Sequence, residues 1–208
     1  MMSGVILPRD VPLWRAACPY LDVRSNDEHT LFSYRLGQGL LRFHPDAREE
    51  IVLPAIVLHD VGWKMFPEEK LAQAVGPNAK HPELQRAHEI EGARIARGLL
   101  ERLAVPEVPI EPVIAIIDGH DTRKEAISLE DALMKDADKL WRFTAHGIAT
   151  ISSWFAMGDV ETVAMLESYV VPSLLTPAGR MMAEALLAAG ETSAWMIKLP
   201  AEERTSPQ

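Results

Sequence analysis

The residues that could perform chemistry in this sequence are mainly histidines and aspartates. The chain has seven histidines and one cysteine, and His59 directly precedes Asp60 in the segment IVLHDVGW. Together, imidazole and carboxylate groups bind zinc and other divalent transition metals. The candidates in or beside predicted helical segments are His29, His59, Asp60, His88, His120 and Asp138. These residue types indicate a metal centre with nitrogen and oxygen ligands.

The spacing of these candidates fits a helical protein. A single His-Asp dipeptide is weak evidence, because such pairs are common in turns. Here the intervals are 30 residues from His29 to His59, then 29, 32 and 18 residues to His88, His120 and Asp138. Each interval is about one helix and one turn, so a helical bundle can bring one ligand per helix to a common point. The spacing therefore supports one shared site.

The elements that must position these side chains are predicted to be helices. Apolar residues recur three and four positions apart in the segments 31–41, 83–103, 128–155 and 160–175. No sustained alternation of apolar and polar residues suggests a sheet. Helix starts are predicted at Asn26 or Asp27, Asp46, Pro82, Ser128 with Asp131, Asp159, and Thr176–Pro177. We therefore expect an all-α fold, a single compact helical bundle.

Two breaks in the helical pattern lie near the His-Asp pair. Pro54 should kink its helix one turn before His59. Gly62 can end that helix just after Asp60. The stretch 64–82 is predicted to be a loop that carries one short helix.

Length and charge limit the classes of function. With 208 residues, 48% of them hydrophobic, the chain is expected to form one domain over 1–208. A net charge of -9 argues against a nucleic-acid duplex or an anionic membrane as partner. The single Cys18, read as a packing residue, fits a reducing compartment, and the cytoplasm is the expected location. No segment is apolar enough over the length that a membrane span needs.

The ordered set resembles the HD-domain superfamily of metal-dependent phosphohydrolases. The family pattern is a His, then His-Asp, then a distal Asp in an "ADRL" or "ADKL" context. Here these positions are His29, His59–Asp60 and the Asp138 of DADKL, and the resemblance covers residues 26–143 as the metal-binding core. Residues 144–200 would add C-terminal helices that complete the bundle and shape the pocket or a homodimer face.

The resemblance implies which residues bind metal. His29, His59, Asp60 and Asp138 would hold a first ion, while His88 and His120 stand where some members bind a second ion bridged by the His-Asp carboxylate. One or two divalent ions (Mn, Fe, Co, Ni or Zn) are therefore expected.

Asp136 also lies in DADKL, but residues two apart on a helix point about 200° apart, so only one of Asp136 and Asp138 can face the site. Apolar residues share each face, so the local pattern does not choose between them. The resemblance chooses Asp138.

The resemblance also implies an activity. We expect a phosphohydrolase that acts on a small phosphorylated molecule, with a nucleotide as the expected substrate, through a metal-activated hydroxide. Asp60 is the central catalytic candidate, and Lys64 and Arg123 are the leading candidates to bind phosphate oxygens, with Arg35 and Lys124 as further cations. Trp63 would line the pocket. It stands where one branch that cleaves cyclic dinucleotides has a lysine, which puts that substrate in doubt.

Two other classes of function share these ligands. A small branch of the superfamily holds two irons and activates dioxygen to cleave a carbon bond. A metal-stabilised helical module could instead bind a nucleotide or a partner without turnover. Dioxygen consumption under iron loading separates the oxygenase from the hydrolase.

Overall fold

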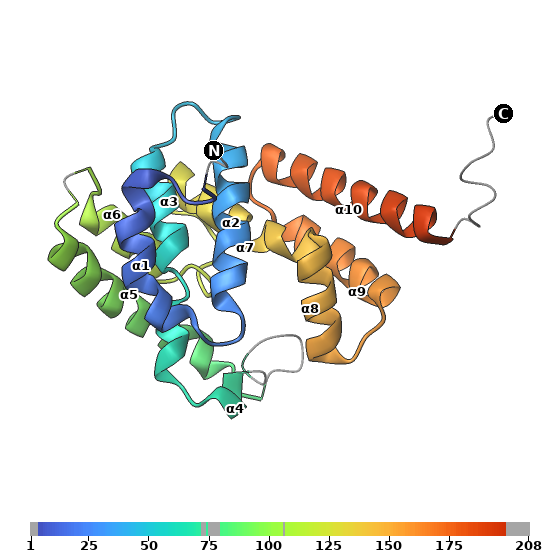
Figure 1. Cartoon of the computed structure of the whole chain (residues 1–208), viewed down its shortest axis with the longest axis horizontal. Helices are drawn as coiled ribbons and strands as arrows, with labels where there is room; N and C mark the ends of the chain where they lie inside the picture. Colours follow the sequence, from blue (N-terminus) through green and yellow to red (C-terminus); the bar gives the residue numbers. More distant parts are fainter. Residues whose placement is uncertain (1–3, 72–73, 75–79, 106, 199–208) are drawn as a thin grey trace.

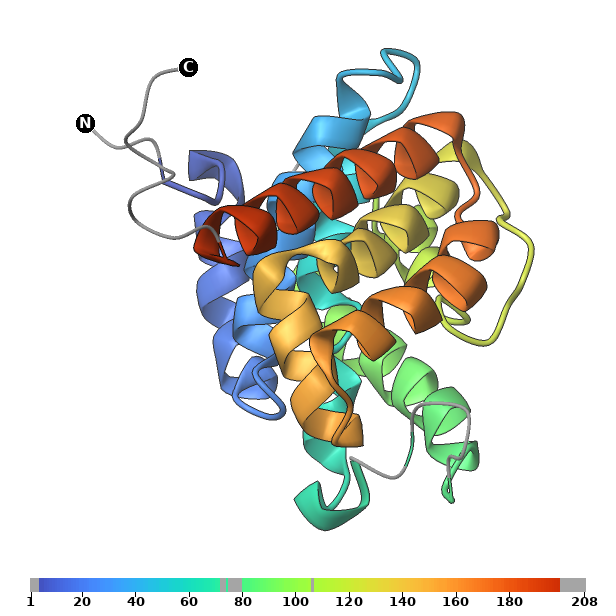
Figure 2. The same cartoon turned by 90° about the vertical axis from the view of Figure 1, so that its right-hand side faces the viewer.

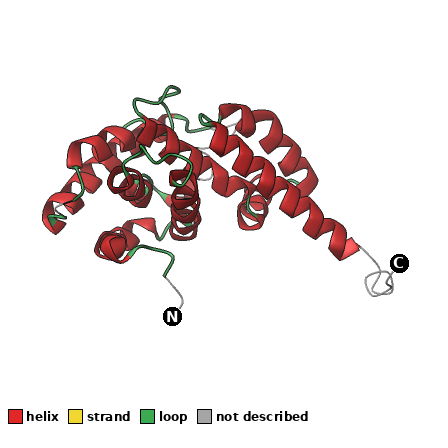
Figure 3. Cartoon of the chain, turned by 90° about the horizontal axis from the view of Figure 1, so that it is seen from above, coloured by secondary structure: helices red, strands yellow, loops and turns green. Residues whose placement is uncertain are grey.

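A computed structural model of the chain describes residues 4–71, 74, 80–105 and 107–198. Every regular element in these ranges is helical (Figure 3), which confirms the predicted all-α class. None of the described helices has the length and apolar character needed to cross a membrane. The α-helices are α1 Val11–Leu21, α2 Asn26–Leu41, α3 Glu49–Leu58, α4 Glu68–Leu71, α5 Glu83–Leu103, α6 Ile110–Ile117, α7 Leu129–Leu140, α8 Ala145–Phe155, α9 Asp159–Met165 and α10 Pro177–Lys198. Several of them are connected by short 3-10 or π turns. These are η1 Pro8–Asp10, η2 Val61–Met65, η3 Trp141–Phe143, η4 Leu166–Val170 and η5 Val171–Ser173.

Helix α3 is the centre of the bundle. Every residue from Ile51 to Leu58 is buried, because α2, α6 and α7 pack around this helix. A helix that is apolar on all sides needs such complete cover. The helix continues through Pro54 and ends at Leu58, so His59 and Asp60 follow at its buried end.

Most predicted helix boundaries agree with the structure. Helix α5 spans the whole of the predicted segment 83–103, and the Ser128 side chain caps α7 by accepting a hydrogen bond from the backbone N–H of Asp131. The start predicted at Asp46 is wrong, since α3 begins at Glu49. The segment 128–155 is divided into α7, η3 and α8, because Thr144 begins a new helix by accepting a hydrogen bond from the N–H of Gly147.

Among its described residues, the predicted loop 64–82 contains one short α-helix, as expected. This helix is α4, Glu68–Leu71. Residues 72–73 and 75–79 of the loop lie outside the described ranges.

Gly62 has a different structural role from the predicted one. The helix has already ended at Leu58, so Gly62 does not stop it. Gly62 lies in η2, which packs directly on α5: a Cβ atom at this position would clash with the carbonyl oxygen of His88 and lie 2.6 Å from the backbone nitrogen of Gly92. Glycine therefore lets two backbones touch, and this contact brings the segment after Asp60 close to His88.

The helices after α7 lie on one side of the bundle. Helix α10 packs on α7 and η3, while α8 contacts η3 and α9. Figure 1 shows α8 and α9 on the opposite side from α1, α5 and α6, and Figure 2 shows α10 running beside α7. These helices therefore form a separate wall that faces the end of α7.

Candidate metal centre

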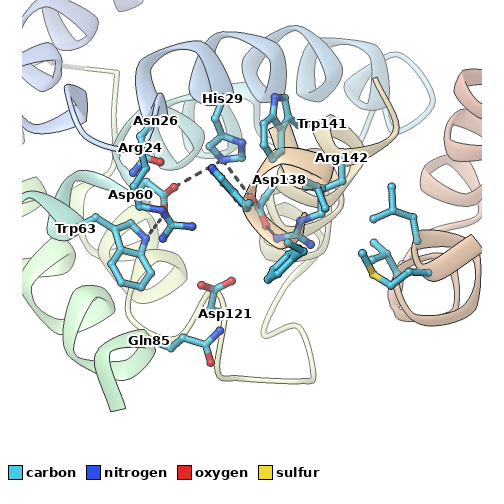
Figure 4. Close-up of a pocket in the computed structure, with 16 residues that line it drawn as sticks. Arg24, Asn26, His29, Asp60, Trp63, Gln85, Asp121, Asp138, Trp141 and Arg142 are labelled. Carbon is cyan, nitrogen blue, oxygen red and sulfur yellow. Dashed lines mark hydrogen bonds and ion pairs between the residues drawn. The ribbon is translucent and has the colours of Figure 1, made fainter. Parts of the chain in front are cut away.

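The six predicted ligands come from five helices and converge on one buried place (Figure 4 shows three of them). Helices α2, α5 and α7 contribute residues from within their length, and the ends of α3 and α6 contribute the rest. All six side chains are buried, with between 0% and 9% of each residue exposed. The residues are His29, His59, Asp60, His88, His120 and Asp138. The structure thus brings together all of the predicted ligands.

A first group of ligands forms around two histidines that face each other. The Nε2 atoms of His29 and His59 are 3.1 Å apart. Oδ1 of Asp138 lies 3.2 Å from the Nε2 of His29 and 3.7 Å from that of His59. Oδ2 of Asp60 lies 3.7 and 3.6 Å from the same two nitrogen atoms. Two imidazoles and two carboxylates therefore surround one point.

A second group mirrors the first on the other side of Asp60. The Nε2 atoms of His88 and His120 are 3.3 Å apart. The other oxygen of Asp60, Oδ1, lies 3.8 Å from the Nε2 of His88 and 3.7 Å from that of His120. Oδ2 of Asp121 lies 3.6 and 3.9 Å from these nitrogen atoms. Asp60 therefore presents one carboxylate oxygen to each group.

Asp121 is a site residue that the sequence reasoning missed. It lines the cavity beside the second group, where its carboxylate matches the position of Asp138 in the first group. Its signal was present in the sequence, because His120–Asp121 repeats the dipeptide His59–Asp60.

Backbone carbonyls fix the orientation of three imidazoles. Nδ1–H of His59 donates to the carbonyl of Ile56 at 2.8 Å, and Nδ1–H of His120 donates to that of Ile117 at 3.0 Å. His88 makes the equivalent contact with Leu84 at 3.3 Å. A histidine that donates through Nδ1 has its lone pair on Nε2, as a metal ligand requires.

These residues fit divalent transition metals. Two Nε2 lone pairs that face each other at 3.1 or 3.3 Å repel unless a proton or a cation lies between them. Two nitrogen atoms that each lie about 2.1 Å from one cation are about 3.0 to 3.4 Å apart for ordinary coordination angles. Both pairs fall in this range. The donor set of nitrogen and carboxylate oxygen suits Mn, Fe, Co, Ni or Zn.

The site is strongly polarised. Burial alone would raise the pKa of Asp60, but contacts with His59 and His120 hold that pKa well below its usual range. Burial opposes protonation of His120, yet Asp121 and Asp60 raise its pKa to about 10. Burial and the charge of His120 lower the pKa of His88 to about 4. The His88–His120 pair can therefore hold one positive charge but not two, and a cation shared between the two Nε2 atoms meets that condition.

A buried carboxylate outside the ligand set positions Asp121. Oε1 of Glu89 accepts hydrogen bonds from the backbone N–H groups of Asp121 and Thr122, both at 2.7 Å. Its Oε2 accepts the hydroxyl hydrogen of Thr122 at 2.7 Å. Glu89 is fully buried and comes directly after His88 on α5. One helix therefore carries both a ligand and the residue that fixes the opposing turn.

The structure separates the roles of Asp136 and Asp138. Asp138 faces His29 and His59, as the family resemblance implied. Asp136 points the other way and accepts hydrogen bonds from the N–H groups of Leu175 and Thr176 and from the Thr176 hydroxyl. It therefore holds the start of α10 and contacts no predicted ligand.

The two groups border a cavity of about 280 Å³. His29, Asp60, Asp121 and Asp138 line it. Trp63 also lines it, as the sequence predicted. The indole ring of Trp63 stacks on His88 with ring centres 3.9 Å apart, and its Nε1–H donates to Oδ1 of Asp60 at 3.1 Å. A small molecule in this cavity would therefore reach both groups.

The two cations predicted to bind phosphate do not line the cavity. Nζ of Lys64 forms an exposed ion pair with Asp22 at 2.5 Å. The Arg123 guanidinium donates to carbonyls at the end of α6, including that of Asp118, and pairs with Asp131 at 3.1 Å. Both side chains are held by other partners, so their contacts do not support the role predicted from their places in the sequence.

Two other arginines line the cavity instead (Figure 4). Arg142 lies one turn beyond Asp138 and pairs with it at 3.3 Å. Arg24 lies between two rings, 5.0 Å from the centre of Trp63 and 4.8 Å from that of Trp154. Burial lowers the pKa of Arg24, while Asp60 and Asp121 oppose the shift. An arginine remains charged at neutral pH even so.

Comparison with known proteins gives one positive finding. The family model described as HD domain matches residues 26–142, which is more than half of the chain. No curated protein and no solved structure matches the chain significantly.

Proposed function

The chain belongs to the HD domain family, and from this premise we propose that it is a metal-dependent phosphohydrolase acting on a small phosphate ester. The observation that carries the proposal is the arrangement around Asp60, whose two oxygens face two separate histidine pairs. That arrangement opens onto a cavity with two arginines. Both features suit phosphoryl transfer, since cations can neutralise the phosphoryl oxygens and a metal can activate water.

Each residue of the centre has a distinct task in this proposal. The first group, His29, His59 and Asp138, would hold one divalent cation, and His88, His120 and Asp121 a second, with Asp60 shared between them. When bound, such cations polarise a phosphoryl oxygen and lower the pKa of a water molecule. The carbonyl contacts of Ile56 and Ile117 keep the imidazoles of His59 and His120 in the ligating orientation.

Arg24 and Arg142 are the residues that we assign to phosphate binding. A guanidinium presents several N–H donors in a plane and binds phosphate oxygens in pairs. Within the described chain the Arg24 guanidinium contacts two indole rings, so its N–H groups remain available to a ligand. The aromatic contacts hold the cation in place without neutralising it.

The proposal is tested with protein purified without a metal-binding tag and reloaded with each of Mn, Fe, Co, Ni and Zn. Phosphate release is measured over a panel of phosphate monoesters, including nucleotides, and of phosphodiesters. Asp60→Ala should abolish both metal binding and phosphate release. His81→Ala is the matched control, because His81 pairs with Glu83 away from the centre.

The outcomes separate the remaining candidates. Metal-dependent phosphate release that Asp60→Ala abolishes supports the hydrolase. Dioxygen consumption by the iron-loaded protein, without phosphate release from any ester, would support the oxygenase instead. If the protein catalyses neither reaction with any of the metals, the result favours a binding module and contradicts the proposal.

A further inference from the structure

The cavity has two chemically different sides. The side formed by the metal centre carries the charged and polar residues. The opposite wall comes from α8, α9 and η4, which all lie after Asp138 in the chain (Figure 4). Its lining residues are aliphatic or aromatic, and one indole N–H is their only strong donor: Ile151, Trp154, Phe155, Met165, Leu166 and Val170. A ligand that spans the cavity would therefore meet charge at one end and hydrocarbon at the other.

Polar side chains of the cavity stay close to the metal centre. Asn26 lies one turn before His29 on α2, Gln85 lies one turn before His88 on α5, and Asp121 follows His120. Among the described residues of the wall, none offers a hydroxyl, amide or charged group, and the indole N–H of Trp154 is the one strong hydrogen-bond donor. A sugar placed against this wall would leave most of its hydroxyls without partners, and burying an unpaired polar group is costly.

Arg24 marks the boundary between the two sides. Its guanidinium lies between Trp63, next to the metal centre, and Trp154, on the apolar wall. Arg24 and Ser25 both have left-handed backbone conformations, with φ of 55° and 56°. Residues other than glycine rarely adopt this conformation, and such strain clusters at functional sites. The strained turn between α1 and α2 therefore places the Arg24 guanidinium between the metal centre and the apolar wall.

The wall also contains an unusual helical turn. Residues Leu166–Val170 form a π-helix that continues α9, and its first and last residues both line the cavity. Such turns are rare and are frequent at functional sites. Leu166 and Val170 are four positions apart, so they lie on the same face of this helical turn and both reach the cavity.

We propose that the substrate is the phosphate monoester of a small apolar alcohol. Its hydrocarbon group packs on the apolar wall, and its phosphate lies toward Arg24, Arg142 and the metal centre. This inference rests on the proposed phosphohydrolase activity and narrows it, because it disfavours the nucleotide expected from the sequence. Hydrolysis breaks the bond between phosphorus and the ester oxygen and joins the oxygen of a water molecule to phosphorus. One proton of that water goes to the alcohol, and inorganic phosphate is released.

The first experiment compares n-pentyl phosphate, glycerol 3-phosphate and adenosine 5′-monophosphate as substrates of the metal-loaded protein. All three are esters of primary alcohols, so the reactivity of their leaving groups is similar. The pentyl ester should have kcat/KM at least roughly tenfold above the other two, the scale of discrimination that an apolar pocket provides. Equal or faster hydrolysis of the nucleotide or the glycerol ester would overturn the inference while leaving the hydrolase intact.

Variants of the wall test the same point. Met165→Gln keeps the side-chain length but adds an amide, and should lower kcat/KM for pentyl phosphate roughly tenfold. Met181→Gln is the matched control, because Met181 lies exposed on α10 outside the cavity lining. Val170→Thr nearly preserves the shape of the side chain but adds a hydroxyl, and it should also lower kcat/KM for pentyl phosphate. A folded Met165→Gln and a folded Val170→Thr that both keep the preference for the pentyl ester would refute the role of the wall.

A binding measurement separates this inference from the proposed function. Calorimetry compares n-pentylphosphonate with methylphosphonate, which carry the same anionic group and cannot be hydrolysed at an ester bond. Four additional methylene groups should tighten binding about 10- to 100-fold, and Met165→Gln should reduce that gain. If no ester is hydrolysed but the gain is observed, the proposed activity fails and the apolar ligand class stands. If the two phosphonates bind equally, the inference fails whatever the activity.

Discussion

Replacing Asp136 by asparagine should destabilise the protein while leaving its capacity to bind metal. The Asp136 carboxylate is fully buried and accepts three hydrogen bonds at the start of α10: Oδ1 accepts the N–H of Leu175 at 2.7 Å, and Oδ2 accepts the N–H and the hydroxyl of Thr176 at 2.8 and 2.7 Å. An asparagine has one acceptor oxygen and one NH2 group. If the oxygen keeps the Thr176 contacts, the NH2 group must face the N–H of Leu175.

The size of the effect follows from these contacts. A hydrogen bond to a charged group contributes about 1.5–3 kcal/mol, and the variant loses one such bond and weakens two others. We therefore expect the free energy of unfolding of the metal-free protein to fall by about 2–4 kcal/mol. For a chain of this size that corresponds to a decrease in Tm of roughly 5–15 °C.

The comparison with Asp138→Asn makes the test specific. Oδ1 of Asp138 lies 3.2 Å from the Nε2 of His29, so its replacement should remove a ligand of the first group and lower the metal content from about two ions to about one. Both variants are measured by denaturant unfolding after chelation and by metal content after reloading. If Asp136→Asn loses its metal at unchanged stability while Asp138→Asn keeps its metal, the orientation of α7 deduced here is wrong.

Three further predictions concern the centre and its supports. His88→Ala and His120→Ala should each lower the metal content from about two ions to about one, because the first group stays intact; two ions retained in both variants would contradict the second site. Gly62→Ala should destabilise the fold by about 1–3 kcal/mol, since its Cβ would clash with the backbone of α5, and an unchanged unfolding midpoint would show that the two backbones are not in contact. Arg24→Gln should raise KM for a phosphate ester roughly 10- to 100-fold at unchanged metal content, because a charge-assisted contact with phosphate is lost; Arg94→Gln, on the exposed face of α5, is the control and should leave KM unchanged.

The helices could be predicted because their signals are local, and most of the ligand set could be predicted from its spacing together with the family resemblance. The apolar repeat of 83–103 gave the whole of α5, and the spacing of the histidines placed each near the point of convergence. The choice between Asp136 and Asp138 could not come from the local pattern, because α7 is buried at every position from Asp131 to Asp138. The family resemblance was needed to choose between them.

The cations at the cavity could not be predicted, because their positions depend on contacts between distant segments. Lys64 and Arg123 were chosen because they follow ligands in the sequence, but Asp22 and Asp131 hold them elsewhere. Arg24 gave no local signal. Its position depends on Trp154, which comes from the C-terminal wall.

The central claim is that two cations lie on either side of Asp60. A crystal structure of protein purified without a metal-binding tag, with anomalous scattering recorded at the absorption edges of Mn, Fe, Co, Ni and Zn, tests this claim most directly. We predict one anomalous peak between His29, His59 and Asp138, and a second between His88, His120 and Asp121. A well-ordered structure of metal-supplemented protein with no peak beside Asp60, or with its metal bound elsewhere, would contradict the claim.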